Sequence, residues 1–286
     1  MKERSIRDYF HLMWMTAIVL CAVTALFVTL FVSCTKAPAG QAPAVSATAA
    51  AQTSEPSEPS APADTPEATP EATPEPTPEP IPTELQLTDD MGQEYLDKCI
   101  FLGDSTTYGM LAYGVLPKSQ IWTPSSGTLT LNAQSYAEID VYADDGSSRS
   151  MSIRDAVAEI QPEILVVTLG VNGISFMDEA SFKEEYTDLI GAIQDLSPDT
   201  KIICHSIYPV IDWQAPEGIN NERVNAANVW VYDIAVATGT RYLNTHDALM
   251  GPDGNLVEDY GNGDGIHLDP DGFAIVLNSV RTHGYR

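Results

Sequence analysis

Three residues of this chain have the types and the spacing that nucleophilic catalysis requires. Ser105 ends a Gly-Asp-Ser sequence that directly follows the apolar run 100–102. Asp264 and His267 stand three residues apart near the other end of the chain. At that spacing the carboxylate can bind one ring nitrogen of the imidazole while the other nitrogen faces a substrate. The pattern therefore predicts a nucleophile, a general base and a carboxylate that orients the base.

The surroundings of Ser105 predict a position at the edge of a sheet. The run 100–102 is typical of a buried strand, and residues 105–115 are compatible with a helix. A strand that turns into a helix at a Ser places that Ser at the carboxyl edge of a parallel sheet, where open α/β sheets bind ligands. Free backbone N–H groups at the helix start suit a developing negative charge. On this stretch alone, the alternative that Ser105 only caps the helix stays open.

Asn172 is a candidate for stabilising that negative charge. It lies in a Gly-Val-Asn-Gly sequence that immediately follows the fully apolar run 164–169. A neutral amide donor at the carboxyl edge of the sheet can hold an oxyanion. The structural alternative is a turn Asn between two glycines.

The loop that contains Asp264 has two other interpretations. One is a polar loop whose Asp caps the following helix. The other is a calcium loop built from Asp253, Asn255, Glu258, Asp259 and Asp264. The spacing of these residues is not that of an EF-hand, so we expect no metal site and no cofactor.

Taken together, these blocks resemble those of the SGNH hydrolases, also called the GDSL esterase/lipase family. The Gly-Asp-Ser sequence, the Gly-Val-Asn sequence and the Asp-Gly-Ile-His sequence match three of the family's blocks in the family's order. The resemblance covers nearly all of residues 85–286. It implies that Ser105 is the nucleophile, that His267 acts first as base and then as acid, and that Asp264 orients His267.

The resemblance also implies an oxyanion hole formed by the Ser105 N–H, the side-chain amide of Asn172 and the N–H of a glycine from another block. That block departs from the family pattern. Gly127 is the leading candidate, and Gly146 is a weaker one because we expect it in a hairpin turn. Gly173 stands where the family usually has an Asp.

Aromatic residues near these blocks are candidates for substrate contact. We expect Tyr108, Trp122 and Trp213, the last within the segment 208–219, to line the cleft. Aromatic faces suit sugars, but they equally suit a core or an acyl chain. For His205, a hydrogen-bonded position in the core is favoured over a place in the site.

Strand-like and helix-like segments alternate along residues 85–286. This alternation predicts an α/β fold with three α/β/α layers and a mostly parallel sheet, and the resemblance implies the flavodoxin-like SGNH hydrolase fold. The expected strands are 100–102, 164–169, 201–207 and 241–244, with short β-type segments at 120–123 and 129–131 and a hairpin turn at 144–147. The expected helices are 105–115, 153–160, 179–196, 220–238 and 273–281.

The first 84 residues predict an anchor and a spacer. Residues 1–34 hold a basic stretch and then the uncharged apolar run 13–33, long enough for a bilayer, which takes about 20 apolar residues. The positive-inside rule places the remainder outside the cytoplasm. The sequence Phe-Val-Ser-Cys34 also resembles a lipoprotein processing site, so both a membrane span and a lipidated Cys34 stay open. Residues 35–84 are rich in Pro, Ala, Thr and Glu and are expected to be a disordered linker.

Charge and cysteine content exclude some classes of function. The formal net charge is −26, and the domain at 85–286 has no basic run, which excludes nucleic acid as a partner because phosphate binding needs clustered Lys and Arg. Cys99 and Cys204 fall in strands that we do not expect to be neighbours. Two buried free thiols are therefore favoured over a disulfide.

These observations predict a membrane-anchored serine esterase whose catalytic domain lies outside the cytoplasm. The expected substrate is an acyl ester, with acetyl favoured, on a carbohydrate or a cell-wall polymer. The carbohydrate part follows from the predicted location and the resemblance. Two alternatives stay open, namely a lipase or thioesterase that acts on acyl chains and a non-catalytic wall-binding domain that keeps the fold.

Overall fold

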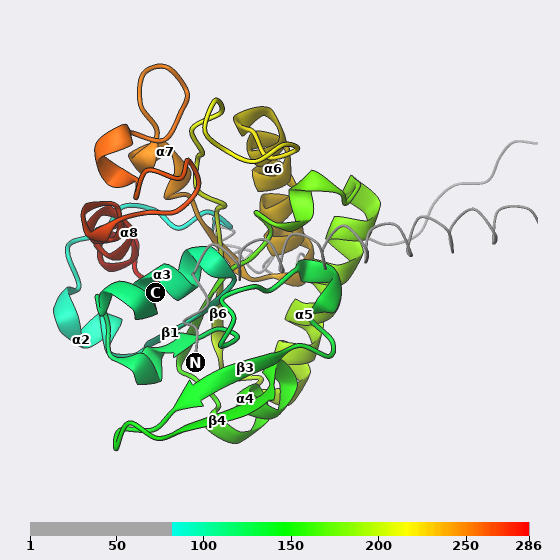
Figure 1. The fold of residues 1–286 in the computed structure, drawn as a ribbon. Coiled ribbons are helices and arrows are strands. Elements are labelled where there is room, and N and C mark those ends of the chain that lie inside the picture. The colour runs from blue at the N-terminus through cyan, green and yellow to red at the C-terminus, as the bar shows by residue number, and fades with distance from the viewer. Residues whose placement is uncertain (1–81, 286) are drawn as a thin grey trace, which may run out of the picture. The chain divides into compact units, whose positions relative to one another are not determined.

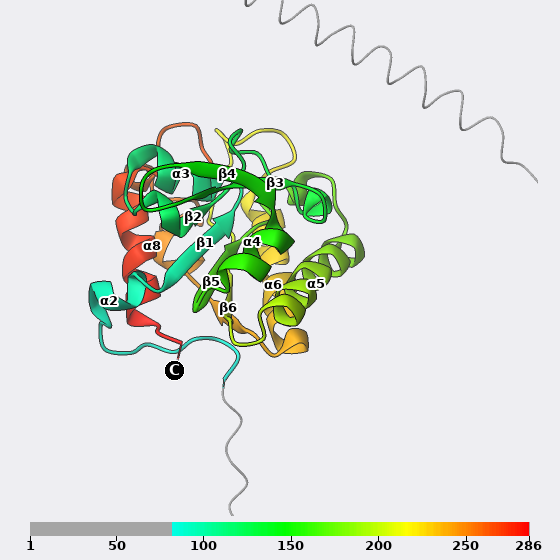
Figure 2. The ribbon, with the colours of Figure 1, turned by 90° about the horizontal axis from the view of Figure 1, so that it is seen from below.

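Five short strands form a sheet in which neighbouring strands run parallel. The computed structural model describes residues 82–285 and orders these strands β2-β1-β5-β6-β7 (Figure 1, Figure 2). Their bounds are β1 Cys99–Gly103, β2 Ile121–Trp122, β5 Ile164–Thr168, β6 Lys201–His205 and β7 Arg241–Leu243. The predicted α/β fold with a parallel sheet is confirmed.

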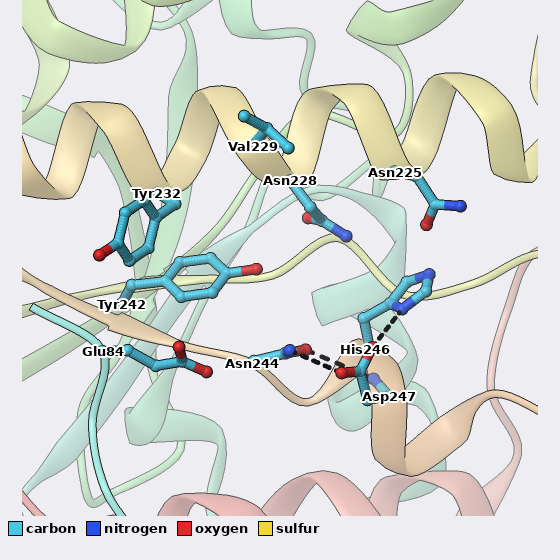
Figure 3. A pocket seen from close by; sticks show the side chains of 9 residues that line it. All are labelled: Glu84, Asn225, Asn228, Val229, Tyr232, Tyr242, Asn244, His246 and Asp247. Carbon is cyan, nitrogen blue, oxygen red and sulfur yellow. Dashed lines mark hydrogen bonds and ion pairs between the residues drawn. The ribbon is translucent and has the colours of Figure 1, made fainter.

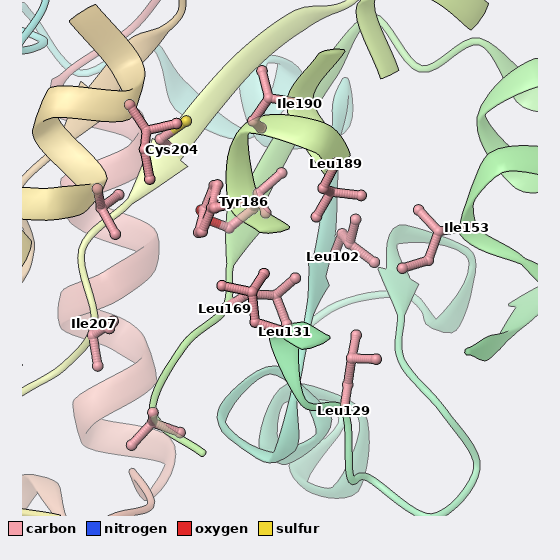
Figure 4. Close-up of a cluster of buried hydrophobic side chains, with 14 of the residues drawn as sticks. Leu102, Leu129, Leu131, Ile153, Leu169, Tyr186, Leu189, Ile190, Cys204 and Ile207 are labelled. Atoms are coloured by element: carbon pink, nitrogen blue, oxygen red, sulfur yellow. The ribbon is translucent and has the colours of Figure 1, made fainter. Parts of the chain in front are cut away.

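The strands feed two separate hydrophobic cores because successive side chains of a strand point to opposite faces of the sheet. In β5, Leu165 and Val167 join one core, whereas Ile164 and Val166 join the other. Side chains from α4, α5 and α6 complete the first core (Figure 4), and side chains from α2, α3, α7 and α8 complete the second. The helices are α2 Gly92–Leu96, α3 Ser105–Tyr113, α4 Ile153–Ile160, α5 Glu179–Leu196, α6 Asn221–Thr238, α7 His246–Leu249 and α8 Pro270–Thr282. The sheet is thus covered by helices on both faces.

Helix α5 shows why the bounds of a helix can be predicted from the sequence. The Asp178 carboxylate accepts a hydrogen bond from the Ser181 N–H at 2.9 Å and so caps the first turn. Phe182, Tyr186 and Ile190 recur at helical spacing and are fully buried. The cap and the apolar stripe are both local sequence features, and the observed bounds equal the predicted ones.

An antiparallel hairpin, β3 Glu138–Tyr142 and β4 Ser148–Ser152, forms a separate two-stranded sheet. Its turn contains Gly146 at φ +83°, a left-handed conformation that Gly adopts without strain. The Gly146 N–H donates to the Ala143 carbonyl at 2.9 Å. This is the turn predicted at 144–147.

The short strand predicted at 129–131 is wrong. The side chains of Leu129 and Leu131 are buried in the first core, and residues Leu131–Ala133 form a 3₁₀ helix, η3. The Leu129 carbonyl accepts a hydrogen bond from the Asn172 side chain at 3.2 Å rather than from a neighbouring strand. The other 3₁₀ helices among residues 82–285 are η2 Lys118–Gln120, η4 Gly173–Ser175 and η5 Glu258–Tyr260.

The described residues begin before the predicted start of the domain. The Tyr242 N–H in β7 donates to the Thr83 carbonyl at 2.9 Å, and the Leu85 N–H donates to the Tyr242 carbonyl at 2.8 Å. Thr83 and Glu84, which the sequence assigns to the linker, therefore pair with the edge of the sheet.

The predicted span and residues 35–81 of the predicted linker lie outside the described residues. Within residues 82–285, no helix combines the length and the apolar character that a membrane crossing needs.

Cys99 in β1 and Cys204 in β6 are separated by β5, as expected, and both are buried free thiols. Burial raises the pKa of each thiol to about 12. Both therefore stay protonated and unreactive at neutral pH.

Candidate active site

Strand register brings the two amino-terminal blocks to one edge of the sheet. Gly103 at the end of β1 is paired with Thr168 at the end of β5. Ser105 and Asn172 follow these two residues closely, so both lie at the carboxyl edge of adjacent parallel strands. This edge is where open α/β sheets bind ligands.

The Ser105 hydroxyl is hydrogen-bonded to His267. Its Oγ lies 2.8 Å from His267 Nε2, although the two residues are 162 positions apart in the chain. Ser105 is the first residue of α3, and the side chain that caps this helix is Asp104. The Ser105 hydroxyl is therefore hydrogen-bonded to His267 and does not cap the helix. The alternative that Ser105 only caps α3 is wrong.

Asp264 holds the other side of the His267 ring. Its Oδ2 lies 2.6 Å from His267 Nδ1, and its Oδ1 accepts the N–H groups of Ile266 and His267, each at 2.9 Å. Partial burial opposes ionisation of Asp264, but the hydrogen bonds from His267 and Ile266 outweigh it and lower the pKa to about 2. The carboxylate is thus ionised at neutral pH. It fixes the tautomer that leaves Nε2 able to accept the Ser105 proton.

Asp104 joins the Ser105 block to the Asn172 block, a role that sequence reasoning missed. The carboxylate is almost completely buried and accepts hydrogen bonds from the Thr106 N–H at 3.0 Å and the Thr106 hydroxyl at 2.8 Å. Burial raises its pKa, and hydrogen bonds from Thr106 and from the Gly170 N–H oppose that rise. The available signal was the Asp immediately before a predicted helix, which is a preferred capping residue.

The side-chain amide of Asn172 lies at the end of β5 and donates one hydrogen to the Leu129 carbonyl at 3.2 Å. An amide nitrogen carries two hydrogens, so a second donor is left for a ligand. The bond to Leu129 also ties the end of β5 to the loop that contains Gly127.

Gly127 lines the cavity beside Ser105, but its N–H is already engaged. It donates to the Pro124 carbonyl at 2.8 Å. Gly127 has φ +69°, and a Cβ there would lie 3.0 Å from the Tyr108 ring. The close approach and the left-handed backbone explain the glycine. They do not supply the free N–H that the predicted oxyanion role needs. Gly146 lies in the hairpin turn and is not among the residues that line this cavity.

A cavity of about 260 Å³ opens beside the triad. Its wall brings together four of the predicted site residues, Ser105, Tyr108, Gly127 and His267. The other lining residues are Gly109, Ala112, Tyr113, Ser126, Asn262 and Leu268. One face of α3 thus forms much of the wall.

The two tryptophans are placed elsewhere. Trp122 is fully buried in the first core, so the expectation that it lines the cleft needs correction. The hairpin pairs with the chain directly after β2 at the bridge between Thr123 and Asp140, and its Ile139 and Val141 side chains lie in the same core as Trp122. Trp213 is 62% exposed and does not line the cavity at Ser105.

The segment 208–219 instead supports the loop that carries the acid and the base. The Ile211 N–H donates to the Gly265 carbonyl at 2.8 Å. Gly265 has φ +86°, and a Cβ there would lie 2.6 Å from the Gln214 side chain. Only Gly allows this approach, so the loop between Asp264 and His267 is held in place by its neighbour.

His205 is a hydrogen-bonded core residue, as favoured from the sequence. Its Nδ1 lies 2.9 Å from the Thr168 hydroxyl, and its Nε2 lies 2.7 Å from the Thr245 hydroxyl. Complete burial lowers its pKa to about 3, so the ring is neutral at neutral pH. Among residues 82–285, no group of three or more His, Cys, Asp or Glu side chains is arranged to hold a metal.

The hydrogen-bonded series Ser105, His267 and Asp264 can activate a hydroxyl for attack on a carbonyl carbon. Residues 101–275 match the model of the GDSL-like Lipase/Acylhydrolase family. No curated protein sequence matches the chain significantly.

Several solved structures are similar to part of the chain. A putative acylhydrolase from Bacteroides fragilis is 15% identical over 69% of this chain and 88% of its own, with a TM-score of 0.47. A GDSL-like lipase from Bacteroides thetaiotaomicron is 18% identical over 62% and 82%, with a TM-score of 0.43. The acetyl xylan esterase AlAXEase is 16% identical over 63% and 96%, with a TM-score of 0.42. Family membership rests on the match at residues 101–275, not on these distant likenesses.

Proposed function

The chain belongs to the GDSL-like lipase/acylhydrolase family, and on that premise we propose that it is a serine esterase that removes a short acyl group, acetyl above all, from a carbohydrate or cell-wall polymer. The observation that carries the proposal is the continuous hydrogen bonding from the Ser105 hydroxyl through His267 to the ionised Asp264.

The first half of the reaction forms an acyl-enzyme. Ser105 Oγ attacks the ester carbonyl carbon while His267 Nε2 takes the hydroxyl proton. The tetrahedral intermediate then collapses, and the alcohol leaves with the proton that His267 returns. In the second half, water attacks the acyl group, gives its proton to His267 and releases the acid and the free Ser105 hydroxyl. Asp264 stays ionised throughout and stabilises the imidazolium.

The negative oxygen of the tetrahedral intermediate requires fixed donors. The N–H of Ser105 lies in the first turn of α3, where backbone donors have no partner within the helix. The second hydrogen of the Asn172 amide supplies another donor from the end of β5. Two donors of this kind lower the barrier because they are already oriented when the charge develops.

The size of the cavity favours a small acyl group. Its volume of about 260 Å³ lies below the ~300–1,000 Å³ of pockets that hold drug-sized ligands. Tyr108 and Tyr113 are bulky members of its wall, and Ala112 is a small one. A long acyl chain would have to leave this cavity for solvent.

The proposed location is the outer side of a membrane. It rests on the apolar run 13–33, the basic residues before it and the proline-rich spacer after it. Such a tether would hold the hydrolase domain at a distance from the membrane, where a surface polymer is the accessible ester.

A series of p-nitrophenyl esters tests the proposal. We expect kcat/KM to be highest for the acetate and to fall for the butyrate and the octanoate. A kcat/KM that rises with chain length would favour the lipase or thioesterase alternative, and no hydrolysis of any ester would favour a non-catalytic binding domain. Release of acetate from an O-acetylated polysaccharide by the full chain tests the polymer part.

A further inference from the structure

Asn262 lines the cavity beside Ser105, and its backbone pairs directly with that of the base, His267. The Asn262 N–H donates to the His267 carbonyl at 2.9 Å, next to the bridge between Gly261 and Leu268. No step of the proposed reaction uses Asn262. Its place beside the base makes it a candidate for contact with the substrate.

One polar atom of the Asn262 side chain is held, and the other is available. The Oδ1 atom accepts the Asp264 N–H at 3.0 Å. Because a backbone N–H can only donate, this bond identifies the accepting atom as the amide oxygen. The Nδ2 atom carries two hydrogens and has no hydrogen-bond partner among residues 82–285. The side chain is exposed at the cavity, so a ligand can reach these hydrogens.

The proton transfers at His267 indicate which part of the ester lies near Asn262. His267 Nε2 takes the proton of Ser105 Oγ, which is 2.8 Å away, and returns it to the oxygen of the leaving alcohol. That oxygen must therefore come within hydrogen-bond reach of Nε2. The next atoms of the alcohol then lie on the side of the cavity that His267 and Asn262 form.

Three other side chains of the wall could donate a hydrogen bond, but each belongs to a different segment from His267. Ser126 lies in the loop after β2, and Tyr108 and Tyr113 lie on α3. Asn262 and His267 instead come from one loop and are paired through the backbone. Asn262 is therefore the donor whose position relative to the base is fixed within a single loop.

The charge next to Asn262 favours an uncharged partner. The carboxyl group of Asp264, with a pKa of about 2, is ionised at neutral pH. It would repel an anionic alcohol that came into contact with Asn262. A neutral hydroxyl or ether oxygen can accept an amide hydrogen without that repulsion.

From these contacts we infer that Asn262 Nδ2 donates to a neutral oxygen that the alcohol part of the substrate carries next to its ester group. The preferred substrates are then esters of polyols, in which a hydroxyl or ether oxygen lies on the carbon beside the esterified one. Asn262 is thus a residue that determines specificity for the alcohol. The inference rests on the proposed esterase function and adds to it the chemical class of the alcohol.

The test compares two acetates that differ in one group of atoms. Methoxyethyl acetate has an ether oxygen where butyl acetate has a CH₂ group, so only the former can accept a hydrogen bond from Asn262. Release of acetate by the full chain, kept in detergent, gives kcat/KM for each ester. We expect loss of the Asn262 donor to lower the ratio of the two values, methoxyethyl over butyl, by roughly 2- to 10-fold, as the loss of one hydrogen bond does.

Two substitutions remove the donor. Asn262→Asp keeps an oxygen that can accept the Asp264 N–H, whereas Asn262→Ala removes that oxygen as well. A change in the loop or in the charge beside the triad alters the rate for both esters alike, so the ratio does not report it. The matched control is Asn225→Asp, an exposed asparagine on α6 that lines a separate cavity (Figure 3) and should leave the ratio unchanged.

Equal ratios in the wild type and in Asn262→Asp would overturn the inference, whatever the absolute rates. If Asn262→Asp does not fold, the ratio in Asn262→Ala decides. Hydrolysis of p-nitrophenyl acetate separates the two proposals. Equal ratios in proteins that still hydrolyse it would overturn the role of Asn262 alone, whereas a wild type that hydrolyses none of the three acetates would overturn the proposed function and this inference together.

Discussion

Asp104 caps helix α3 and thereby leaves the neighbouring Ser105 hydroxyl to His267. The Asp104 carboxylate accepts the Thr106 N–H at 3.0 Å, and Ser105 Oγ lies 2.8 Å from His267 Nε2. Two adjacent residues that could each cap the helix thus have different tasks. The buried carboxylate satisfies the helix end, and the hydroxyl at the first helical position faces the cavity.

We expect Ser105→Ala to abolish ester hydrolysis while the protein stays folded. Among the hydroxyls of the cavity wall, that of Ser105 is hydrogen-bonded to His267 Nε2 and can pass its proton to the base. The substitution removes one small side-chain oxygen. Hydrolysis of p-nitrophenyl acetate and a thermal melt check the two halves of this expectation. The control is Ser125→Ala, an exposed serine in the loop before Gly127. Turnover like that of the wild type in folded Ser105→Ala would exclude the proposed nucleophile.

Asn172→Ala should lower kcat by roughly 10²–10³-fold, the usual loss for one oxyanion donor. The amide lies at the end of β5, and one of its hydrogens is held by the Leu129 carbonyl. Steady-state kinetics on the acetate ester distinguish the possible roles. A change confined to KM would instead identify Asn172 as a residue that positions the substrate.

Asp104 and Asp178 each cap a helix, α3 and α5 respectively, so Asp178→Ala is the matched control for Asp104→Ala. Alanine at either position removes a helix cap, which costs about 0.5–2 kcal/mol of stability. Only Asp104→Ala also disturbs the backbone around the nucleophile, and we expect it to lower kcat by roughly 10²-fold through misplacement of Ser105. Urea unfolding and esterase kinetics measure the two effects. Equal kcat values in the two variants would show that Asp104 does not position Ser105.

His205 should make the protein sensitive to acid. Its pKa is about 3 in the folded chain because the ring is buried, whereas an unfolded imidazole has a pKa of about 6.5. Between these values the unfolded state binds one proton more, so stability falls as the pH falls. Above about pH 6.5 the neutral His205 ring imposes no loss of stability. Below that pH the free energy of unfolding falls progressively toward about pH 3, by up to about 1.4 kcal/mol per pH unit.

Urea unfolding from about pH 7 to about pH 4 measures that slope. His205→Gln keeps polar atoms in the buried position but does not titrate, so its free energy of unfolding should depend less steeply on pH than that of the wild type. Identical slopes for the two proteins would show that His205 is not the group responsible.

A chain shortened to residues 82–286 should keep the full esterase activity of the longer protein. The described strands and helices and the triad lie in this range, and Thr83 and Leu85 are hydrogen-bonded to Tyr242 in β7. A chain that begins at residue 87 loses these bonds and should melt at a lower temperature. The comparison uses p-nitrophenyl acetate and circular dichroism. A large loss of activity in a folded, monomeric 82–286 chain would show that the earlier residues contribute to the domain.

The sequence by itself determined the features that depend on neighbouring residues. The helix caps, the apolar stripe of α5 and the apolar runs of the buried strands each lie within one short segment. This is why the bounds of α4 and α5 agree with the prediction. The order of the Ser, Asn and Asp–His blocks also pointed to the triad, because each block follows or precedes a recognisable element.

Only the tertiary structure decided which side chains meet and which become buried. Trp122 has the same local sequence whether it is exposed or buried, and it is buried in a core that includes Ile139 and Val141 of a hairpin later in the chain. The N–H of Gly127 is used within its own turn, and Asp104 rather than Ser105 serves the helix end. The cavity at Ser105 likewise needs α3 and the loops of Gly127 and Asn262 from three parts of the chain. Burial and hydrogen bonding of this kind depend on contacts between segments that are far apart in the chain, so no local sequence pattern can reveal them.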